Sequence, residues 1–213
     1  MVYLMILLEA LGLVIALAID EMICSFSYGA NKIKIPMRSM LTINAIDTAL
    51  LGIGLLFGTL VGQLIPLALT ATLSFFILFF LGLSKVFDSA IKKIIRKKNG
   101  INKNFNFSLF NLGFILTVYA NPEKADADES KVLSPKEAVP LALALGLDGL
   151  SVGFGVGIAA IHFGAIMLMS FLVGMFMLIL GSWLGNKIAK SLSLDFGWLS
   201  GLLLILIAIS GII

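Results

Sequence analysis

Residues 9–29 read EALGLVIALAIDEMICSFSYG, and residues 137–157 read EAVPLALALGLDGLSVGFGVG. The two stretches align without a gap and share several identities, including an aspartate in the middle of each, Asp20 and Asp148. Identities in sequence rich in Leu, Ala and Gly arise easily by chance, but an acid at the same place in two apolar stretches is harder to dismiss. The alignment therefore predicts an internal repeat, and each copy begins with an apolar helix that carries an aspartate.

The composition favours a membrane protein. Of the 213 residues, 60% are hydrophobic and 13% are charged, and the mean hydropathy is +1.09. An ordinary soluble domain is about 45–50% apolar and about 25% charged. A soluble globule of this size could not hide so much apolar surface, so a cytosolic enzyme, a disordered chain and a nucleic-acid-binding domain are excluded. The single cysteine, Cys24, cannot form an internal disulfide.

The apolar stretches predict six membrane spans, each of about 20 residues. Residues 48–84 and residues 149–186 contain no Asp, Glu, Lys or Arg, and each has the length of two spans joined by a turn. We predict an all-α integral membrane fold with six transmembrane helices, arranged as two inverted-topology three-helix repeats. The expected spans are 3–28, 40–62, 66–85, 138–160, 164–186 and 196–213. The expected units are a first repeat over 1–86, a cytoplasmic central loop over 87–136 and a second repeat over 137–213.

The basic residues predict how the chain is oriented. All 15 fall in three connecting segments: between the first and second spans, in the central loop, and between the fifth and sixth spans. Short loops could simply avoid charge, but the positive-inside rule explains the distribution better and makes these three segments cytoplasmic. We therefore expect a multi-pass protein of the bacterial plasma membrane with both termini outside. The N-terminal apolar run has no preceding Lys or Arg, which favours a retained first span over a cleaved signal peptide.

Four acidic residues lie inside predicted spans without a basic residue to pair with: Asp20, Glu21, Asp47 and Asp148. A carboxylate in the middle of a membrane helix costs about 2.5–3.5 kcal/mol on insertion scales. Such acids persist when they pair, take a proton or bind a cation. Protonated, purely structural aspartates are the alternative to a cation site. Glu21 aligns with Gly149 in the repeat, and this favours a peripheral or structural role for Glu21.

Helical spacing predicts which polar groups share a face. Asn44 and Asp47 lie on one face of the second span, and Asp148 and Ser151 lie on one face of the fourth. The predicted metal ligands are Asp20, Asn44, Asp47, Asp148 and Ser151. Such an oxygen-rich set suits Mg²⁺, Ca²⁺ or Mn²⁺. Three carboxylates around one divalent ion leave one negative charge, which suggests proton coupling.

Glycines spaced four residues apart predict close helix packing. The sequence pairs the GTLVG of the second span with the GSWLG of the fifth, as equivalent parts of the two repeats. The glycines expected in helix contacts are Gly58, Gly62, Gly153, Gly157, Gly181 and Gly185.

Residues 126–137 of the central loop have the spacing of an EF-hand, a loop that holds Ca²⁺ with oxygen ligands. The candidate ligands of this second metal site are Asp126, Asp128, Ser130, Val132 (through its carbonyl), Ser134 and Glu137. Lys131 occupies the sixth position, where the sharp turn favours glycine. The alternative is a solvated acidic linker in which Ser134 and Glu137 form a capping box at the start of the fourth span.

Three segments carry a resemblance: AIDEMICSFSYG around Asp20, NAIDTALLGIGLLFG around Asp47 and GLDGLSVGFGVG around Asp148. Together they resemble the bacterial manganese efflux pump family, over all six spans. The resemblance implies Mn²⁺ export with these three aspartates as the metal-binding acids. The chain departs from the family pattern at Glu21 and Gly149, where alanine is usual, and at Asp47, where glutamate is usual. Its long central loop, with NPEKADADESKVLSPKEA, resembles the sporulation membrane protein (YtaF-type) branch of the family.

These observations predict a membrane transporter that exports a divalent cation, Mn²⁺ above others, with proton coupling. The alternative is a non-transporting sporulation membrane protein, either a scaffold or a metal-responsive partner. An enzyme is not expected, because the single histidine, His162, lies in a turn and no nucleophile–base pair is visible. We expect no cofactor, Mn²⁺ as substrate, and Ca²⁺ or Mg²⁺ as further candidates at the central loop. The expected partners are the lipid bilayer and the cation, with a homo-oligomer left open and nucleic acid excluded.

Overall fold

The computed structural model describes residues 2–66, 69–70, 72–84, 118, 122–158 and 163–188. Within these residues the fold is helical. The long helices are α1 (Val2–Ala30), α2 (Met37–Leu64), α5 (Pro135–Ile158) and α6 (Phe163–Ile188). Each contains a stretch long and apolar enough to cross a membrane, which in α1 begins at Leu11. Over the described residues, the long apolar helices are consistent with an integral membrane protein of the helical class.

Shorter elements complete the described chain. An apolar helix over Thr72–Ser84 falls within the predicted third span, and a 3₁₀ turn, η1 (Pro122–Ala125), precedes the central acidic loop. The predicted sixth span, 196–213, lies outside the described residues. The four long helices agree with the first, second, fourth and fifth predicted spans to within a few residues at each end.

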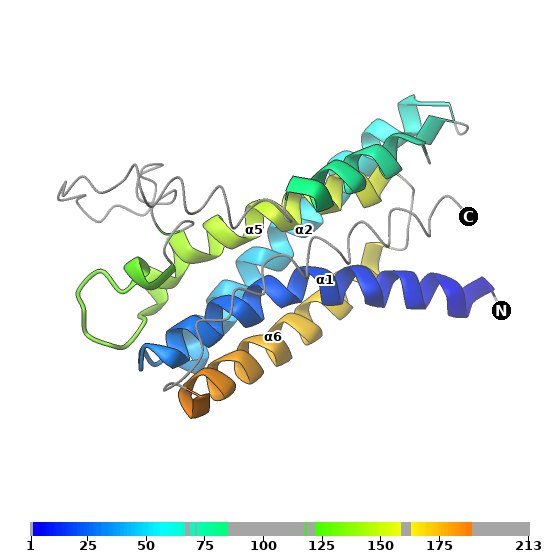
Figure 1. Cartoon of the computed structure of the whole chain (residues 1–213). Coiled ribbons are helices and arrows are strands. Elements are labelled where there is room, and N and C mark those ends of the chain that lie inside the picture. The colour runs from blue at the N-terminus through cyan, green and yellow to red at the C-terminus, as the bar shows by residue number, and fades with distance from the viewer. Residues whose placement is uncertain are drawn as a thin grey trace.

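The long helices pack as two pairs, and each pair takes one helix from each predicted repeat. Helix α1 lies along α6, and α2 lies along α5, with a smaller contact between α2 and α6. Figure 1 shows the blue α1 beside the yellow-to-orange α6, and the cyan α2 beside the yellow-green α5. The middle of the molecule is thus the region where all four helices meet.

Glycines bring α2 against α5. A Cβ atom built on Gly54 would collide with the carbonyl oxygen of Leu150, and one on Gly58 would collide with that of Phe154. One turn further along α2, the contact also moves one turn further along α5, from Leu150 to Phe154. Helices α2 and α5 therefore run in the same direction. The absence of a side chain at these two positions lets the backbones touch, as in other membrane helix pairs with small residues four apart.

The contacts between α1 and α6 follow the same pattern. A Cβ atom on Gly181 would collide with the carbonyl oxygen of Met22, and one on Gly185 would collide with that of Phe26. In the repeat alignment, Met22 and Phe26 correspond to the residues of α5 that receive the equivalent contacts from α2. The two helix pairs therefore use the same backbone contacts.

The second helices of the two repeats, α2 and α6, can be aligned by their motifs or by their contacts. The alignment that the contacts give differs by one helical turn from the alignment of the GTLVG and GSWLG motifs. Gly54 and Gly58 are the contact equivalents of Gly181 and Gly185, whereas the motif alignment pairs Gly58 and Gly62 with them. Short Gly-rich motifs match equally well in neighbouring registers, and only the helix contacts distinguish the two. This difference matters for the site described below.

All described basic residues lie at one end of the bundle, where α1 and α6 end and α2 and α5 begin (Figure 1, left). Helix α1 ends here in a C-terminal cap. Ile33 N–H donates to the Tyr28 carbonyl at 2.9 Å, and Lys32 takes a left-handed φ of 58° at the position that usually holds glycine. At the opposite end, the described residues include no Lys or Arg. This distribution agrees with the charge asymmetry that the sequence shows.

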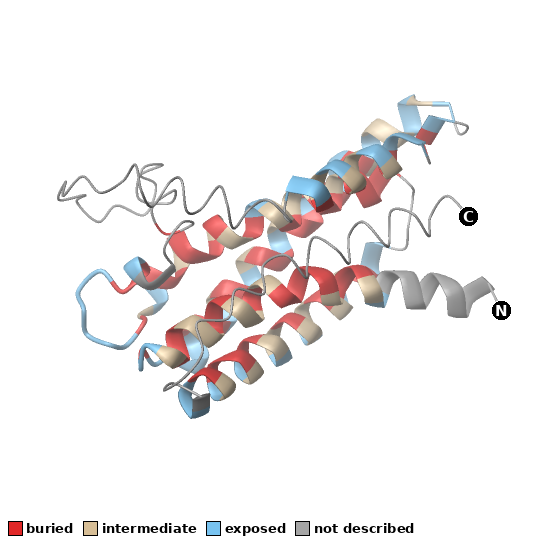
Figure 2. Ribbon diagram, viewed as in Figure 1, coloured by how far each residue is buried: buried red, intermediate tan, exposed pale blue. Residues whose placement is uncertain are grey.

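Burial follows the pairing. The facing sides of the four helices are buried, and their outer sides are exposed (Figure 2). The exposed sides carry large apolar residues, including Leu56, Phe57, Leu60, Leu168, Leu172 and Phe176. Exposed apolar surface on this scale suits contact with lipid acyl chains rather than water.

Candidate metal site

A cluster of polar side chains lies buried where the four helices meet. Glu21 of α1 is 3% exposed, and Asn44 and Asp47 of α2 are 0% and 8% exposed. Thr48, one residue further along α2, is also buried. All four contribute oxygen atoms, and burial of so many polar groups in an apolar bundle is costly unless the groups are paired or bind a ligand.

Glu21 and Asp47 bring two carboxyl groups together from different helices. The charges of Asp47 and of the adjacent Asp20 both act on Glu21. Among the described residues, every Lys and Arg lies at or beyond the helix ends or in the connecting loops. A divalent cation between the two carboxylates would balance both charges.

Three buried oxygens of this cluster have no hydrogen-bond partner among the described residues: Glu21 Oε2, Asn44 Oδ1 and Thr48 Oγ1. The amide of Asn44 is held in place because its Nδ2 donates to the Phe171 carbonyl of α6 at 2.7 Å. That bond turns Oδ1 away from Phe171. An unsatisfied buried polar atom costs about 1–3 kcal/mol, so three in one place call for a ligand.

Glycines of α5 and α6 make room for the cluster. A Cβ atom on Gly174 would lie 2.6 Å from Asn44 Oδ1 and 2.7 Å from Glu21 Oε2, so both oxygens are directed at the same spot on α6. On the opposite side, Cβ atoms on Gly146 and Gly149 would lie 3.2 Å and 3.4 Å from Asp47 Oδ1. Each carboxyl group is therefore packed against a helix backbone rather than a side chain.

The two acids occupy complementary positions in the repeat. Glu21 aligns with Gly149, and in the register of the helix contacts Asp47 corresponds to Gly174. Glu21 packs against Gly174, and Asp47 packs against Gly149. Each acid of the first repeat thus faces a glycine of the second repeat, and that glycine occupies the position equivalent to the other acid. Because the second repeat has glycines where the first has acids, the bundle forms one asymmetric cluster instead of two identical ones.

The predicted ligands are distributed around this cluster. Asn44 and Asp47 belong to it. Asp20 and Asp148 are half-buried and immediately precede Glu21 and its counterpart Gly149. Ser151 is differently placed, because its Oγ donates to the Leu147 carbonyl of its own helix at 3.0 Å.

Glu21 and Thr48 belong to the buried cluster, but they are not among the ligands predicted from the sequence. Glu21 lacks an acidic counterpart in the second repeat, and the prediction of a peripheral or structural role rested on that. Its burial contradicts a peripheral position and is compatible with a structural role. The signal available in the sequence was its helical face, on which the neighbouring positions Val14, Leu17 and Ser25 are apolar or small.

The central loop forms the capping box expected at the start of α5. Ser134 N–H and Oγ donate to Glu137 Oε2 at 2.9 Å and 2.8 Å, and Glu137 N–H donates back to Ser134 Oγ at 3.4 Å. The other carboxylate oxygen, Oε1, accepts from the backbone N–H of Ala127 at 3.0 Å. Glu137 therefore ties the acidic loop to the first turn of α5.

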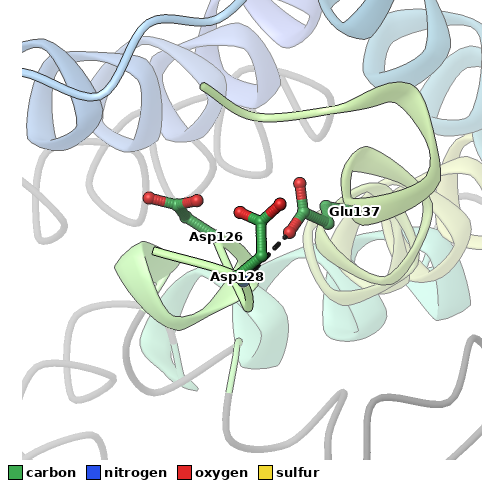
Figure 3. A group of neighbouring side chains, drawn as sticks. All are labelled: Asp126, Asp128 and Glu137. Carbon is green, nitrogen blue, oxygen red and sulfur yellow. Dashed lines mark hydrogen bonds between the residues drawn. The ribbon is translucent and has the colours of Figure 1, made fainter. Parts of the chain in front are cut away.

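The same loop brings three carboxylates together. Oxygen atoms of Asp126, Asp128 and Glu137 lie within 4.8 Å of one another (Figure 3). Lys131 takes a left-handed φ of 62°, as an EF-hand requires at its sixth position, and its N–H donates to Asp126 Oδ2 at 3.1 Å. The capping box is therefore present, and the three carboxylates lie close together as the EF-hand spacing predicts. Metal binding by the loop stays a prediction.

Backbone contacts hold this loop against the connection between α1 and α2. Leu133 N–H donates to the Lys34 carbonyl at 2.9 Å, and Lys34 N–H donates to the Lys131 carbonyl at 2.8 Å. Ser39 Oγ, in the first turn of α2, donates to the Leu133 carbonyl at 2.6 Å. The side chain of Leu133 is fully buried. The acidic loop is therefore anchored to helices of both halves.

The two aspartates of the loop have pKa values shifted in opposite directions. Burial raises the pKa of Asp126, and this outweighs the lowering effect of the hydrogen bond from Lys131 N–H. Hydrogen bonds from the Ser130 side chain and backbone lower the pKa of the exposed Asp128. A proton therefore competes for Asp126 at a higher pH than for an ordinary aspartate.

Comparison with known proteins now becomes informative. A family model described as "Putative manganese efflux pump" matches residues 106–212. The chain belongs to this manganese efflux pump family. The "Probable sporulation protein YtaF" of Bacillus subtilis (strain 168) is 30% identical over 167 residues, which make up 76% of this chain and 77% of that relative. No solved structure matches the chain.

Membership of the manganese efflux pump family makes this chain a multi-pass membrane protein of a metal ion transporter family, not of an enzyme family. The family match covers α5 and α6, which hold Gly149 and Gly174. The acids that face these glycines, Glu21 and Asp47, lie on α1 and α2. The predicted resemblance to the manganese efflux pump family is confirmed by the family match and by the similar sporulation protein.

Proposed function

We propose that the protein exports a divalent metal cation, Mn²⁺ above other ions, across the plasma membrane. The proposal is supported by membership of the manganese efflux pump family. It is carried by one observation: carboxylate, amide and hydroxyl oxygens meet in the interior of four membrane-length helices, and three of these oxygens have no partner among the described residues. Hard oxygen ligands of this kind bind Mn²⁺, Mg²⁺ and Ca²⁺ in preference to softer metals.

The proposed mechanism is alternating access by two inverted repeats of three helices. The matching glycine contacts of the α1–α6 and α2–α5 pairs support this symmetry. The cation would bind between the halves at Asp47 and Asn44, with Asp20 and Asp148 at the edge of the site. The basic end of the bundle would face the cytoplasm, with both termini outside, in accordance with the positive-inside rule. The half-buried acids beside the site would exchange protons for the ion as it leaves, because the acids outnumber the charges of one divalent cation.

Cellular metal content tests this function. In a manganese-sensitive host grown in excess Mn²⁺, expression of the wild-type chain is expected to lower cell-associated manganese and restore growth. Asp20→Asn and Asp148→Asn are expected to weaken both effects, because they remove charge beside the site. Equal manganese content with wild type and with empty vector, at matched membrane expression, would disprove export.

The second candidate is a non-transporting membrane protein of sporulation, acting as a scaffold or a metal-responsive partner. The similarity to a relative described as a sporulation protein favours it. The measurement of cellular manganese also separates these two candidates, because a scaffold leaves the metal content of a host cell unchanged.

Cation binding by the central loop stays a prediction, with a defined dependence on pH. Since burial raises the pKa of Asp126, any binding of Ca²⁺ or Mn²⁺ there should weaken as the pH falls through that raised pKa, at a higher pH than for an ordinary aspartate. Over the same fall in pH, without cation, folding becomes more favourable as Asp126 takes its proton, because the raised pKa means that ionisation of the buried group opposes folding. Titration calorimetry of wild type and Asp126→Asn over a series of pH values tests this. An affinity unaffected by Asp126→Asn would exclude the loop site.

A further inference from the structure

We propose that the cation binds in a seat formed by Glu21 Oε2, Asn44 Oδ1 and Thr48 Oγ1 against the backbone of Gly174, with Asp47 completing the charge. This set is called the Gly174 seat below. The inference rests on the proposed function, because it names the ligands and the charge class of the transported ion. It departs from the ligand set that the sequence predicts, in which Asp20 and Asp148 hold the ion.

The unpartnered atoms carry the argument. Each of the three oxygens is buried and without a hydrogen-bond partner among the described residues, and the three come from two different helices. Glu21 and Asn44 are 3% and 0% exposed. The Asn44 amide nitrogen is already used by the Phe171 carbonyl, so its oxygen is fixed as an acceptor. Glu21 Oε2 and Asn44 Oδ1 converge from two helices on Gly174, and the unpartnered hydroxyl of Thr48 follows one turn along α2 from Asn44. Oxygens without a donor, brought together in this way, are the arrangement that a cation requires.

Charge defines the class of ion. Glu21 and Asp47 each contribute one negative charge when ionised, and the remaining two ligands are neutral. A divalent cation makes the site neutral, whereas a monovalent cation leaves a net negative charge in the bilayer interior. Such a residual charge is costly at this depth. The all-oxygen ligand set further selects a hard ion of the Mn²⁺, Mg²⁺ or Ca²⁺ type over a soft one.

Gly174 explains why the seat can exist on this side of the bundle. Any side chain at this position would put its Cβ atom within 2.6 Å of Asn44 Oδ1 and 2.7 Å of Glu21 Oε2. Its counterpart in the other helix pair is Asp47, which faces Gly149 instead. The first repeat thus contributes both charged ligands, Glu21 and Asp47, and the second repeat contributes the glycines that face them. The bundle therefore holds a single seat.

The test measures Mn²⁺ binding to the detergent-purified full chain by electron paramagnetic resonance. All variants carry Asp126→Asn and Asp128→Asn, so that the central loop does not contribute. Gly174→Ala should weaken binding about tenfold or more, since its Cβ would displace Asn44 Oδ1 and Glu21 Oε2 without removing either ligand. Thr48→Val should weaken binding by a similar factor. Gly164→Ala is the matched control on α6, because a Cβ atom there would meet nothing within 4 Å.

The outcomes separate the seat from the function. Unchanged affinity in Gly174→Ala and Thr48→Val, or no saturable binding to the parent protein, would overturn the seat. The seat would also be overturned if Asp20→Asn and Asp148→Asn abolish binding while the seat variants retain it. That result would place the ion at Asp20 and Asp148. If binding follows the seat variants but cells expressing the wild type retain their manganese, the seat stands and export fails. Circular dichroism of each variant confirms that the helices are intact.

Discussion

The variant Asp47→Asn should lose manganese export almost completely while the protein remains folded. Asp47 is 8% exposed, and its charge acts on Glu21 of α1 in the middle of the bundle. Asparagine keeps the size of the side chain and one acceptor oxygen but removes the charge. Replacing even a residue that only supports a metal ligand costs about 10–100-fold, so loss of one of two charges at the site should reduce export by at least this much.

The natural control for Asp47→Asn is Ser151→Ala. Ser151 was predicted as a ligand, but its hydroxyl donates to the Leu147 carbonyl within α5. Its removal should leave export within about a factor of two, since a helix tolerates the loss of such a bond. Cell-associated manganese, measured by mass spectrometry at equal membrane expression, compares the two variants. Equal export by Asp47→Asn and wild type would remove Asp47 from the transport site.

Most of the helical architecture was predictable from the sequence because it follows from the bilayer. Apolar stretches of about 20 residues have few alternatives to a helix in lipid, and the four long helices accordingly appear where the hydropathy predicts them. The buried position of Asp47 was predictable for the same reason, because it is an acid in the middle of a span that contains no Lys or Arg. Helix ends differ by a few residues because polar caps, such as the one at Lys32, extend helices beyond their apolar stretch.

The residues of the buried cluster could not all be predicted, because each acid was judged by whether the other repeat has an acid at the same position. On the sequence alone, an acid that recurs in both halves, such as Asp20, was favoured over one that does not, such as Glu21. In the structure Glu21 is the more deeply buried of the two, and it faces Gly174 rather than a second acid. The correspondence between Asp47 and Gly174 depends on how α2 is aligned with α6 in the repeat, and the Gly-rich motifs alone leave that alignment ambiguous.

The central loop shows the opposite case. Its geometry was predictable from spacing alone, since Ser134 and Glu137 cap α5 and Lys131 adopts the left-handed conformation that the sixth position requires. The unfavourable residue at that position did not prevent the conformation. A left-handed non-glycine residue costs about 1 kcal/mol, which several hydrogen bonds to Asp126 and Glu137 can offset.

Gly58→Ala is expected to lower the stability of the α2–α5 pair. A Cβ atom at Gly58 would collide with the carbonyl oxygen of Phe154 and lie 3.0 Å from the Cα of Gly157, and neither backbone atom can move without separating α2 from α5. We expect a loss of about 1–3 kcal/mol from overpacking. Gly52→Ala is the matched control on the same helix, because its Cβ would meet only the flexible end of Met167. Alanine also favours the helix by about 1 kcal/mol over glycine, so the control should be neutral or slightly stabilising.

The same measurement tests how the repeats are related. Gly185 touches Phe26 as Gly58 touches Phe154, so Gly185→Ala should lower the thermal unfolding midpoint in detergent about as much as Gly58→Ala. Gly62, the partner of Gly185 in the motif alignment, meets the Ile158 carbonyl at 2.7 Å and is only partly buried, so Gly62→Ala should cost less. Gly185→Ala resembling Gly62→Ala rather than Gly58→Ala would contradict the contact register. It would also remove the correspondence between Asp47 and Gly174, from which the asymmetry of the site follows.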